Sequence, residues 1–205
     1  SAIGHNRYST QGKPALRNIQ PIFADLAQSG FALAHNGNLT NAVELRRQLI
    51  ERGAIFQSTM DTEVVLQLVA RAEGSMRERF LEALRAVEGG YAFVGLTNKK
   101  LIGARDPIGL RPLVLGRIGK GWVLASETCA LDIIGAEFIR EIENGETVII
   151  NEDGEITKIK ARAPHELLVA EAERVLNLVP KLKPAIKDNK PVKINYVLPI
   201  KFEIK

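Results

Sequence analysis

Two short polar stretches carry residue types that could hold an amino acid by its charged groups. The first, "IGHNRYST" at residues 3–10, contains Arg7 and Thr10, and the second, "STMDTE" at residues 58–63, contains Asp61. A guanidinium fork binds a carboxylate and an aspartate binds an ammonium group, so Arg7 and Asp61 together could orient an α-amino acid. Each also has a simpler interpretation: a surface salt bridge for Arg7 and a helix N-cap for Asp61.

A third polar stretch could stabilise a developing negative charge. "AHNGNLTN" at residues 34–41 follows the apolar residues 30–33, which are typical of a strand that enters a core. The Asn36 side chain and the Gly37 backbone N–H are a natural pair of donors for an oxyanion, and glycine permits the unusual backbone angles of a turn here. The alternative is a plain turn, in which Asn36 and Asn38 hydrogen-bond the local backbone.

The spacing of apolar residues predicts the elements that position these stretches. It predicts a helix over residues 41–52 with Thr40 as its N-cap, and a second helix that begins at Asp61 or Thr62. A third helix begins at Ser75, with a glutamate three residues on that completes a capping box. Short strands are predicted at 91–97, 101–105, 113–117 and 122–126, a short helix at 127–134, and a hairpin at 147–151 and 155–160. Residues 1–160 therefore predict an α+β fold.

The last part of the chain differs in composition from the rest. Residues 1–157 carry 17 Lys and Arg against 19 Asp and Glu, whereas residues 158–205 carry 11 against 5. This change favours a domain boundary near residues 158–165. An amphipathic helix is predicted over 166–179, and a strand with one buried face over 192–204, at a sheet edge because Pro199 has no N–H to donate. A solvated lysine-rich face explains the basic end better than nucleic-acid binding does. Nucleic-acid binding through this end would show a steep dependence of affinity on salt concentration.

The remaining bulk features narrow the class of protein. No run is apolar for long enough to span a bilayer. The single cysteine, Cys129, excludes an intramolecular disulfide and suits a reducing compartment, and we expect it to be a buried structural thiol. The start at Ser1, without a methionine, suggests a fragment or a processed chain.

Six motifs together resemble one family. In this order and approximate spacing, "IGHNRYST", "AHNGNLTN", "STMDTEV", "GGYAFV", "ARDPIGLRPLVLG" and "ASETCALD" are similar to the N-terminal glutaminase domain of the glutamine phosphoribosylpyrophosphate amidotransferases of purine synthesis. The resemblance covers about residues 1–160. It implies a truncated αββα fold of the class II, N-terminal-nucleophile type, with a C-terminal helix and strand appended.

The resemblance also assigns roles to residues. Arg7 and Thr10 would bind the α-carboxylate of L-glutamine, Asp61 would bind its α-ammonium group, and Asn36 and Gly37 would form the oxyanion hole. In "ARDPIGLRP" it implies a structural role for Arg105, Asp106 and Arg111 in the loop of the sheet. A phosphoribosyltransferase domain would be the partner of this domain. No cofactor is expected here, because magnesium belongs to that other domain.

The chain departs from the family at the nucleophile. The family uses an N-terminal cysteine whose α-amine serves as the base, and neither Ser1 nor Cys129 matches that position. We therefore expect that this chain alone hydrolyses no glutamine. The resemblance implies a cytoplasmic location and leaves a homo-oligomer open.

The stretch "EAERVLNLVPKLKPAIKDNKPVKINYVLPIKFEIK" at residues 171–205 is similar to the closing helix and strand of a different family, the C-terminal domain of TonB. This resemblance covers about residues 165–205 and implies a second, partial domain over residues 161–205. That module binds an extended peptide at an edge strand, and it would imply the periplasm. The combination suggests a fusion of two partial sequences. A non-catalytic interaction protein, in which residues 192–204 recruit a peptide, is the alternative to the amidotransferase reading.

Overall fold

The computed structural model describes residues 1–6, 15–27, 29–160, 185–187 and 190–192. The chain divides into two compact units, Ser1–Ala161 and Arg162–Lys205. In the second unit the described residues form a hairpin of β10 (Ala185–Lys187) and β11 (Lys190–Val192). The helix predicted over 166–179 and all of the strand predicted over 192–204 except its first residue lie outside the described residues.

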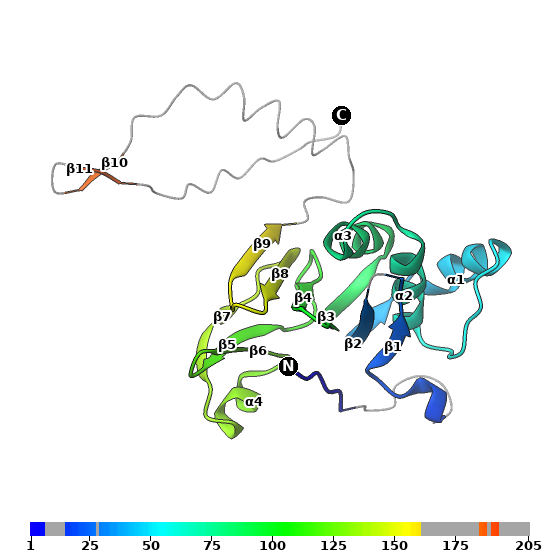
Figure 1. Cartoon of the computed structure of the whole chain (residues 1–205), viewed down its shortest axis with the longest axis horizontal. Helices are drawn as coiled ribbons and strands as arrows, with labels where there is room; N and C mark the ends of the chain where they lie inside the picture. Colours follow the sequence, from blue (N-terminus) through cyan, green and yellow to red (C-terminus); the bar gives the residue numbers. More distant parts are fainter. Residues whose placement is uncertain (7–14, 28, 161–184, 188–189, 193–205) are drawn as a thin grey trace. The chain divides into compact units, whose positions relative to one another are not determined.

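The first unit is built on two antiparallel sheets (Figure 1). The six-stranded sheet has the order β1-β2-β3-β4-β8-β9, with β1 at Ile22–Asp25, β2 at Gly30–Leu39, β3 at Gly89–Thr97, β4 at Lys100–Arg105, β8 at Glu146–Asn151 and β9 at Ile156–Lys160. The three-stranded sheet has the order β6-β5-β7, with β5 at Val114–Ile118, β6 at Gly121–Ala125 and β7 at Glu137–Glu141.

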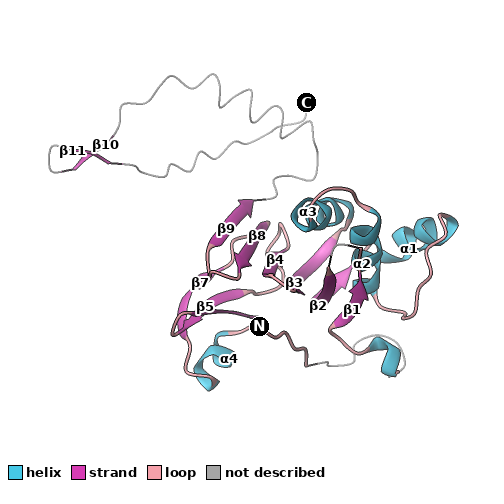
Figure 2. Ribbon diagram, in the orientation of Figure 1, coloured by secondary structure: helices cyan, strands magenta, loops and turns pink. Residues whose placement is uncertain are grey.

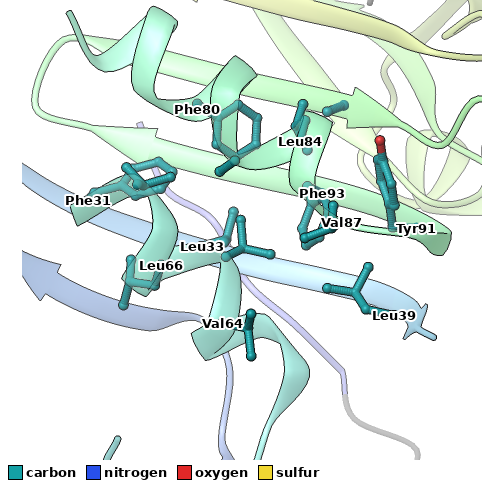
Figure 3. Close-up of a cluster of buried hydrophobic side chains, with 14 of the residues drawn as sticks. Phe31, Leu33, Leu39, Val64, Leu66, Phe80, Leu84, Val87, Tyr91 and Phe93 are labelled. Atoms are coloured by element: carbon teal, nitrogen blue, oxygen red, sulfur yellow. The ribbon is translucent and has the colours of Figure 1, made fainter. Parts of the chain in front are cut away.

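Three helices cover one face of the six-stranded sheet. They are α1 (Ala42–Glu51), α2 (Asp61–Arg71) and α3 (Met76–Ala86). Alternate residues of the strands point to this face, so that Phe31, Leu33 and Phe93 meet helix residues such as Val64 and Phe80 in one buried cluster (Figure 3). Phe80 lies edge-on to both Phe31 and Phe93, with ring centroids 5.9 and 6.4 Å apart. This apolar layer fixes the helices, and with them the start of α2.

The opposite face of the six-stranded sheet packs against the three-stranded sheet. The intervening strand residues, among them Ala92 and Val148, join Leu113 and Leu115 in a second buried cluster. The sheets approach closely at Gly103, where an added Cβ would lie 2.8 Å from the Leu124 side chain. The short helix α4 (Thr128–Ile133) packs on the far side through Leu131. Two sheets thus lie between helical layers, and the α+β, αββα-type prediction is confirmed (Figure 2).

The local predictions have a mixed outcome. All four helices begin within two residues of their predicted starts, and Ser75 forms the predicted capping box with Glu78. The predicted Thr40 cap is wrong: Asn41 is the N-cap residue of α1, and its side chain bonds Ala86 O and Glu88 N instead. Strands β1 and β7 were not predicted, because each is only four or five residues long and largely exposed.

Candidate functional site

The residues proposed for an oxyanion site lie within a strand and not in a turn. Strand β2 continues through them to Leu39, and Asn36 and Gly37 stand opposite Ala92 and Tyr91 of β3. The predicted turn is therefore wrong, because pairing with β3 keeps the whole stretch extended. Glycine is still required: φ of Gly37 is 142°, and an added Cβ would lie 2.1 Å from the Gly90 carbonyl oxygen.

One edge of β2 is open to other groups beyond the point where β1 stops pairing, at Ile22 opposite Leu33. Past that point the His35 N–H donates to Gln20 Oε1 at 2.6 Å and the Leu39 N–H donates to Asp61 Oδ2 at 3.0 Å. Since N–H groups alternate in direction along an antiparallel strand, the Gly37 N–H faces this same edge, between two N–H groups that are bound.

The Asn36 side chain stands beside this edge. It is partly exposed, and among the described residues it has no hydrogen-bond partner. Within the described part of the chain, its amide N–H groups are not used by another residue.

Asp61 lies at the start of α2, directly after the N-cap residue Met60. Its Oδ1 accepts from the Thr62 N–H at 2.9 Å and lies 3.5 Å from Nδ1 of His35, while Oδ2 accepts from Leu39. Burial raises the pKa of Asp61, but the hydrogen bond and charge of His35, together with the two backbone N–H donors, outweigh it and hold the pKa below its usual range. The side chain is 22% exposed, so a charged carboxylate reaches the surface of the site.

The loop before α2 is held by buried polar groups. Glu63 accepts from the N–H groups of Gln57 and Ser58, both at 2.7 Å, and from the Ser58 hydroxyl at 2.6 Å. Arg46 donates to the carbonyls of Ser58 and Met60, and its guanidinium lies 4.0 Å from the centroid of the Phe56 ring. These contacts fix the direction in which the chain enters Asp61.

A single cavity of about 1290 Å³ is lined by Asn36, Gly37 and Asp61. Amide, imidazole and carboxylate groups of β2 and α2 line it together with apolar residues of β4 and β6 such as Leu101 and Leu124. Arg7 and Thr10, predicted to bind the carboxylate of the substrate, lie outside the described residues. The prediction of a buried Cys129 is wrong, since its thiol is exposed and lines this cavity.

The loop "RDPIGLRP" has the structural role that its sequence predicted. Asp106 is fully buried and accepts from the N–H groups of Tyr91, Ile108, Leu110 and Arg111. Arg105 binds the carbonyls of the same region, among them Ile142 O at 2.7 Å. Burial, with a smaller effect of the Asp106 charge, raises the pKa of Tyr91 to about 12. The side chain of Arg111, by contrast, is exposed and lines the cavity.

Three residues at the site were not assigned a role from the sequence: Asn18, Gln20 and His35. His35 is 4% exposed, stacks on Phe93 with ring centroids 4.5 Å apart, and joins β2 to α2 through Asp61. The available signal for Asn18 and Gln20 was the alternation of the two amides with apolar residues in "NIQPIFA". Among the described residues there is no cluster of His, Cys, Asp and Glu that could hold a metal ion, and no helix there is long and apolar enough to cross a membrane.

The fold and the site together define a domain of the N-terminal-nucleophile glutaminase type: two sheets between helices, with amide and carboxylate groups gathered where β2 extends beyond the last residue that pairs with β1. The chain belongs to the glutamine amidotransferase domain family, whose model matches residues 5–132. A second family model, that of the Gram-negative bacterial TonB protein C-terminal, matches residues 146–204. The start of this second match coincides with β8 and β9, which are strands of the six-stranded sheet.

The curated relatives that are similar in sequence include several amidophosphoribosyltransferases. The amidophosphoribosyltransferase of Rhizobium etli is 57% identical over 166 residues, which are 80% of this chain and 33% of that protein. The enzyme of the same name from Staphylococcus aureus is 46% identical over 155 residues, 75% of this chain and 31% of that protein. The solved structure of glutamine phosphoribosylpyrophosphate amidotransferase from B. subtilis, in complex with ADP and GMP, is 42% identical with a TM-score of 0.72, over 76% of this chain and 34% of that one. The chain thus spans about a third of the length of these relatives.

Proposed function

We propose that the first unit binds L-glutamine in the cavity, with Asp61 at the α-ammonium group, Arg7 and Thr10 at the α-carboxylate, and Asn36 and Gly37 at the carboxamide oxygen. The observation that carries the proposal is the edge of β2, where two donors without partners in the described residues stand next to a carboxylate held in its charged form. Hydrogen bonds from an amide and a backbone N–H would strengthen as the carbonyl oxygen becomes an oxyanion.

In the complete protein we propose that this domain supplies ammonia from glutamine to phosphoribosylpyrophosphate, bound by a separate phosphoribosyltransferase domain. The name of the solved B. subtilis relative supports this reading, because it specifies glutamine and phosphoribosylpyrophosphate. The family's nucleophile is an N-terminal cysteine, and residue 1 of this chain is a serine. Binding is therefore the appropriate measurement for these 205 residues, and we expect no turnover from them.

Calorimetric titration of the full chain with L-glutamine tests the proposal. Asp61→Asn removes the charge that attracts the ammonium group, and we expect it and Arg7→Ala to weaken binding at least about tenfold, equivalent to about 1.4 kcal/mol. Asp25→Asn is the matched control, since Asp25 is an exposed aspartate that does not line the cavity. No binding by the parent chain, or equal binding by the two Asn variants, would contradict the proposal.

A glutaminase assay completes the test. Cys129 is the only cysteine in the sequence and lines the cavity, so its thiol is the one cysteine that could attack the substrate within these residues. Turnover that survives Cys129→Ala would show that the expected dependence on an N-terminal cysteine is wrong.

The family match to the TonB C-terminal model supports a second proposal, that residues 192–204 bind an extended peptide by strand addition. Deletion of these residues should abolish binding of such a peptide and leave glutamine binding unchanged. Peptide binding that persists after the deletion would contradict this proposal.

A further inference from the structure

The segment between residues 15 and 21 places two buried amide side chains against the two halves of the candidate glutamine site. Asn18, the last residue of the 3-10 helix Leu16–Asn18, is 3% exposed. Gln20, two residues before the start of β1, is 9% exposed. Both line the cavity together with Asn36 and Asp61. Neither residue has been given a role in binding so far.

Gln20 binds the main chain of the residue that precedes Asn36. Its Oε1 accepts from the His35 N–H at 2.6 Å, and its Nε2 donates to the His35 carbonyl at 3.3 Å. A glutamine side chain can make both bonds because it carries an acceptor and a donor in one plane, as a neighbouring strand would. The Gln20 side chain thus continues the pairing of β2 for one step after β1 has ended.

Asn18 binds the other half of the site in the same manner. Its Oδ1 accepts from the Thr59 N–H at 3.1 Å, and its Nδ2 donates to the Thr59 hydroxyl at 2.9 Å. Thr59 precedes Asp61 by two residues, in the loop whose direction determines where the Asp61 carboxylate lies. The two amides are separated by a single residue, so the distance between their targets is set by a short, buried piece of chain.

We propose that Asn18 and Gln20 are positioning residues for glutamine: they hold the oxyanion donors of β2 and the ammonium-binding carboxylate of α2 at the separation that one substrate molecule requires. The proposal rests on the glutamine site proposed above. Neither side chain needs to touch the substrate, because each acts through the backbone next to a residue that does. Fixing both ends before the ligand arrives reduces the ordering cost of binding.

The test compares substitutions that remove side-chain hydrogen bonds near the site with one that removes such bonds far from it. Gln20→Met and Asn18→Leu remove the two clamps. Arg79→Met is the control, because buried Arg79 likewise donates two bonds to backbone, at Val69 O and Ala70 O, and does not line the cavity. For each full-length variant, the affinity for L-glutamine, the stability to urea and the backbone amide NMR shifts of Gly37 and Asp61 are measured.

We expect Gln20→Met to weaken glutamine binding about tenfold and to move the amide signal of Gly37 more than that of Asp61. Asn18→Leu should have a similar effect on affinity and move chiefly the signal of Asp61. Asn18→Asp retains the acceptor for the Thr59 N–H and should recover most of the affinity. Arg79→Met should lower stability and leave both the affinity and the two signals unchanged.

Two results would overturn the proposal. One is a loss of stability in the clamp variants with the affinity and both amide signals unchanged, as a purely structural role predicts. The other is failure of the two signals to move selectively.

If the parent chain does not bind glutamine, the proposed function fails, and the positioning role is then decided by the amide signals of the free chain. If Gln20→Met does not fold, Gln20→Glu replaces it: it keeps the acceptor for the His35 N–H, removes the donor to the His35 carbonyl, and should still move the amide signal of Gly37 more than that of Asp61.

Discussion

Replacing Gly37 by alanine should be among the most damaging single-methyl additions in this domain. At a φ of 142° an L-residue is strained by about 1–3 kcal/mol. The added Cβ would also lie 2.1 Å from the Gly90 carbonyl oxygen and 2.9 Å from Nε2 of His35. The carbonyl belongs to the backbone of β3, so it can move away only if the pairing of β2 with β3 is disturbed.

The magnitude follows from these two effects. Breaking one or two backbone hydrogen bonds in the paired region costs about 0.5–1.5 kcal/mol each, and more where a buried group is left without a partner. Together with the backbone strain, Gly37→Ala should lower the free energy of unfolding by about 3–5 kcal/mol. Gly53→Ala is the control: Gly53 also has a positive φ, of 82°, but nothing lies within 4 Å of its added Cβ. Its cost should be the conformational part alone, about 1 kcal/mol.

The measurement is urea unfolding of the parent chain and both variants, followed by far-ultraviolet circular dichroism. The reasoning requires a difference between the two variants of at least about 2 kcal/mol, since both place alanine at a positive φ but only the one at Gly37 brings a Cβ against the backbone of β3. Equal destabilisation by Gly37→Ala and Gly53→Ala would refute it. It would mean that β2 and β3 separate at this point without cost.

Two further predictions concern buried ionisable groups. Burial and the charge of Asp106 raise the pKa of Tyr91 from 10.0 to about 12, so the neutral phenol stabilises the fold below pH 10 and this contribution is lost as the pH rises to about 12. The lost stability amounts to about 2.7 kcal/mol, and urea titrations of Tyr91→Phe should not show this loss. An alkaline stability profile of Tyr91→Phe identical to that of the parent chain would contradict the prediction. Glu63→Gln replaces one of two acceptor oxygens by an N–H donor that faces the loop at Ser58, and should lower the free energy of unfolding by about 2–3 kcal/mol. Glu82→Gln, on an exposed face of α3, should leave the free energy of unfolding almost unchanged. Equal shifts of the urea midpoint in the two variants would contradict the prediction.

The parts of the fold that the sequence predicts well are those determined by neighbouring residues. In α3, the capping box determines where the helix starts, and its two residues, the N-cap Ser75 and Glu78, lie three positions apart. The loop of Asp106 is also local, because its carboxylate binds N–H groups two to five residues further along, although its structural role was implied by the family resemblance. Such features are accessible to local reasoning because their partners lie within one turn of chain.

The parts that the sequence did not predict depend on distant partners. "HNGN" has the composition of a turn, and it remains extended because residues 89–93, more than 50 positions away, pair with it. The clamp from Asn18 to Thr59 joins residues 41 positions apart, and neither residue type indicates the other. Cysteine is a residue type that is commonly buried in a core, but the position of Cys129 in α4 leaves its side chain exposed at the cavity.

The two ends of the candidate site are coupled through the backbone of β2. Asp61 stays charged in part because the Leu39 N–H donates to it, and Leu39 lies only two residues beyond Gly37. The conformation at Gly37 therefore determines both the direction of its own N–H and the position of a donor that holds the carboxylate. A disturbance at Gly37 should weaken the proposed ammonium end of the site as well as the proposed oxyanion end. A glutamine side chain has a fixed distance between its α-ammonium group and its carboxamide, and a rigid strand that sets both binding groups is a direct way to match that distance.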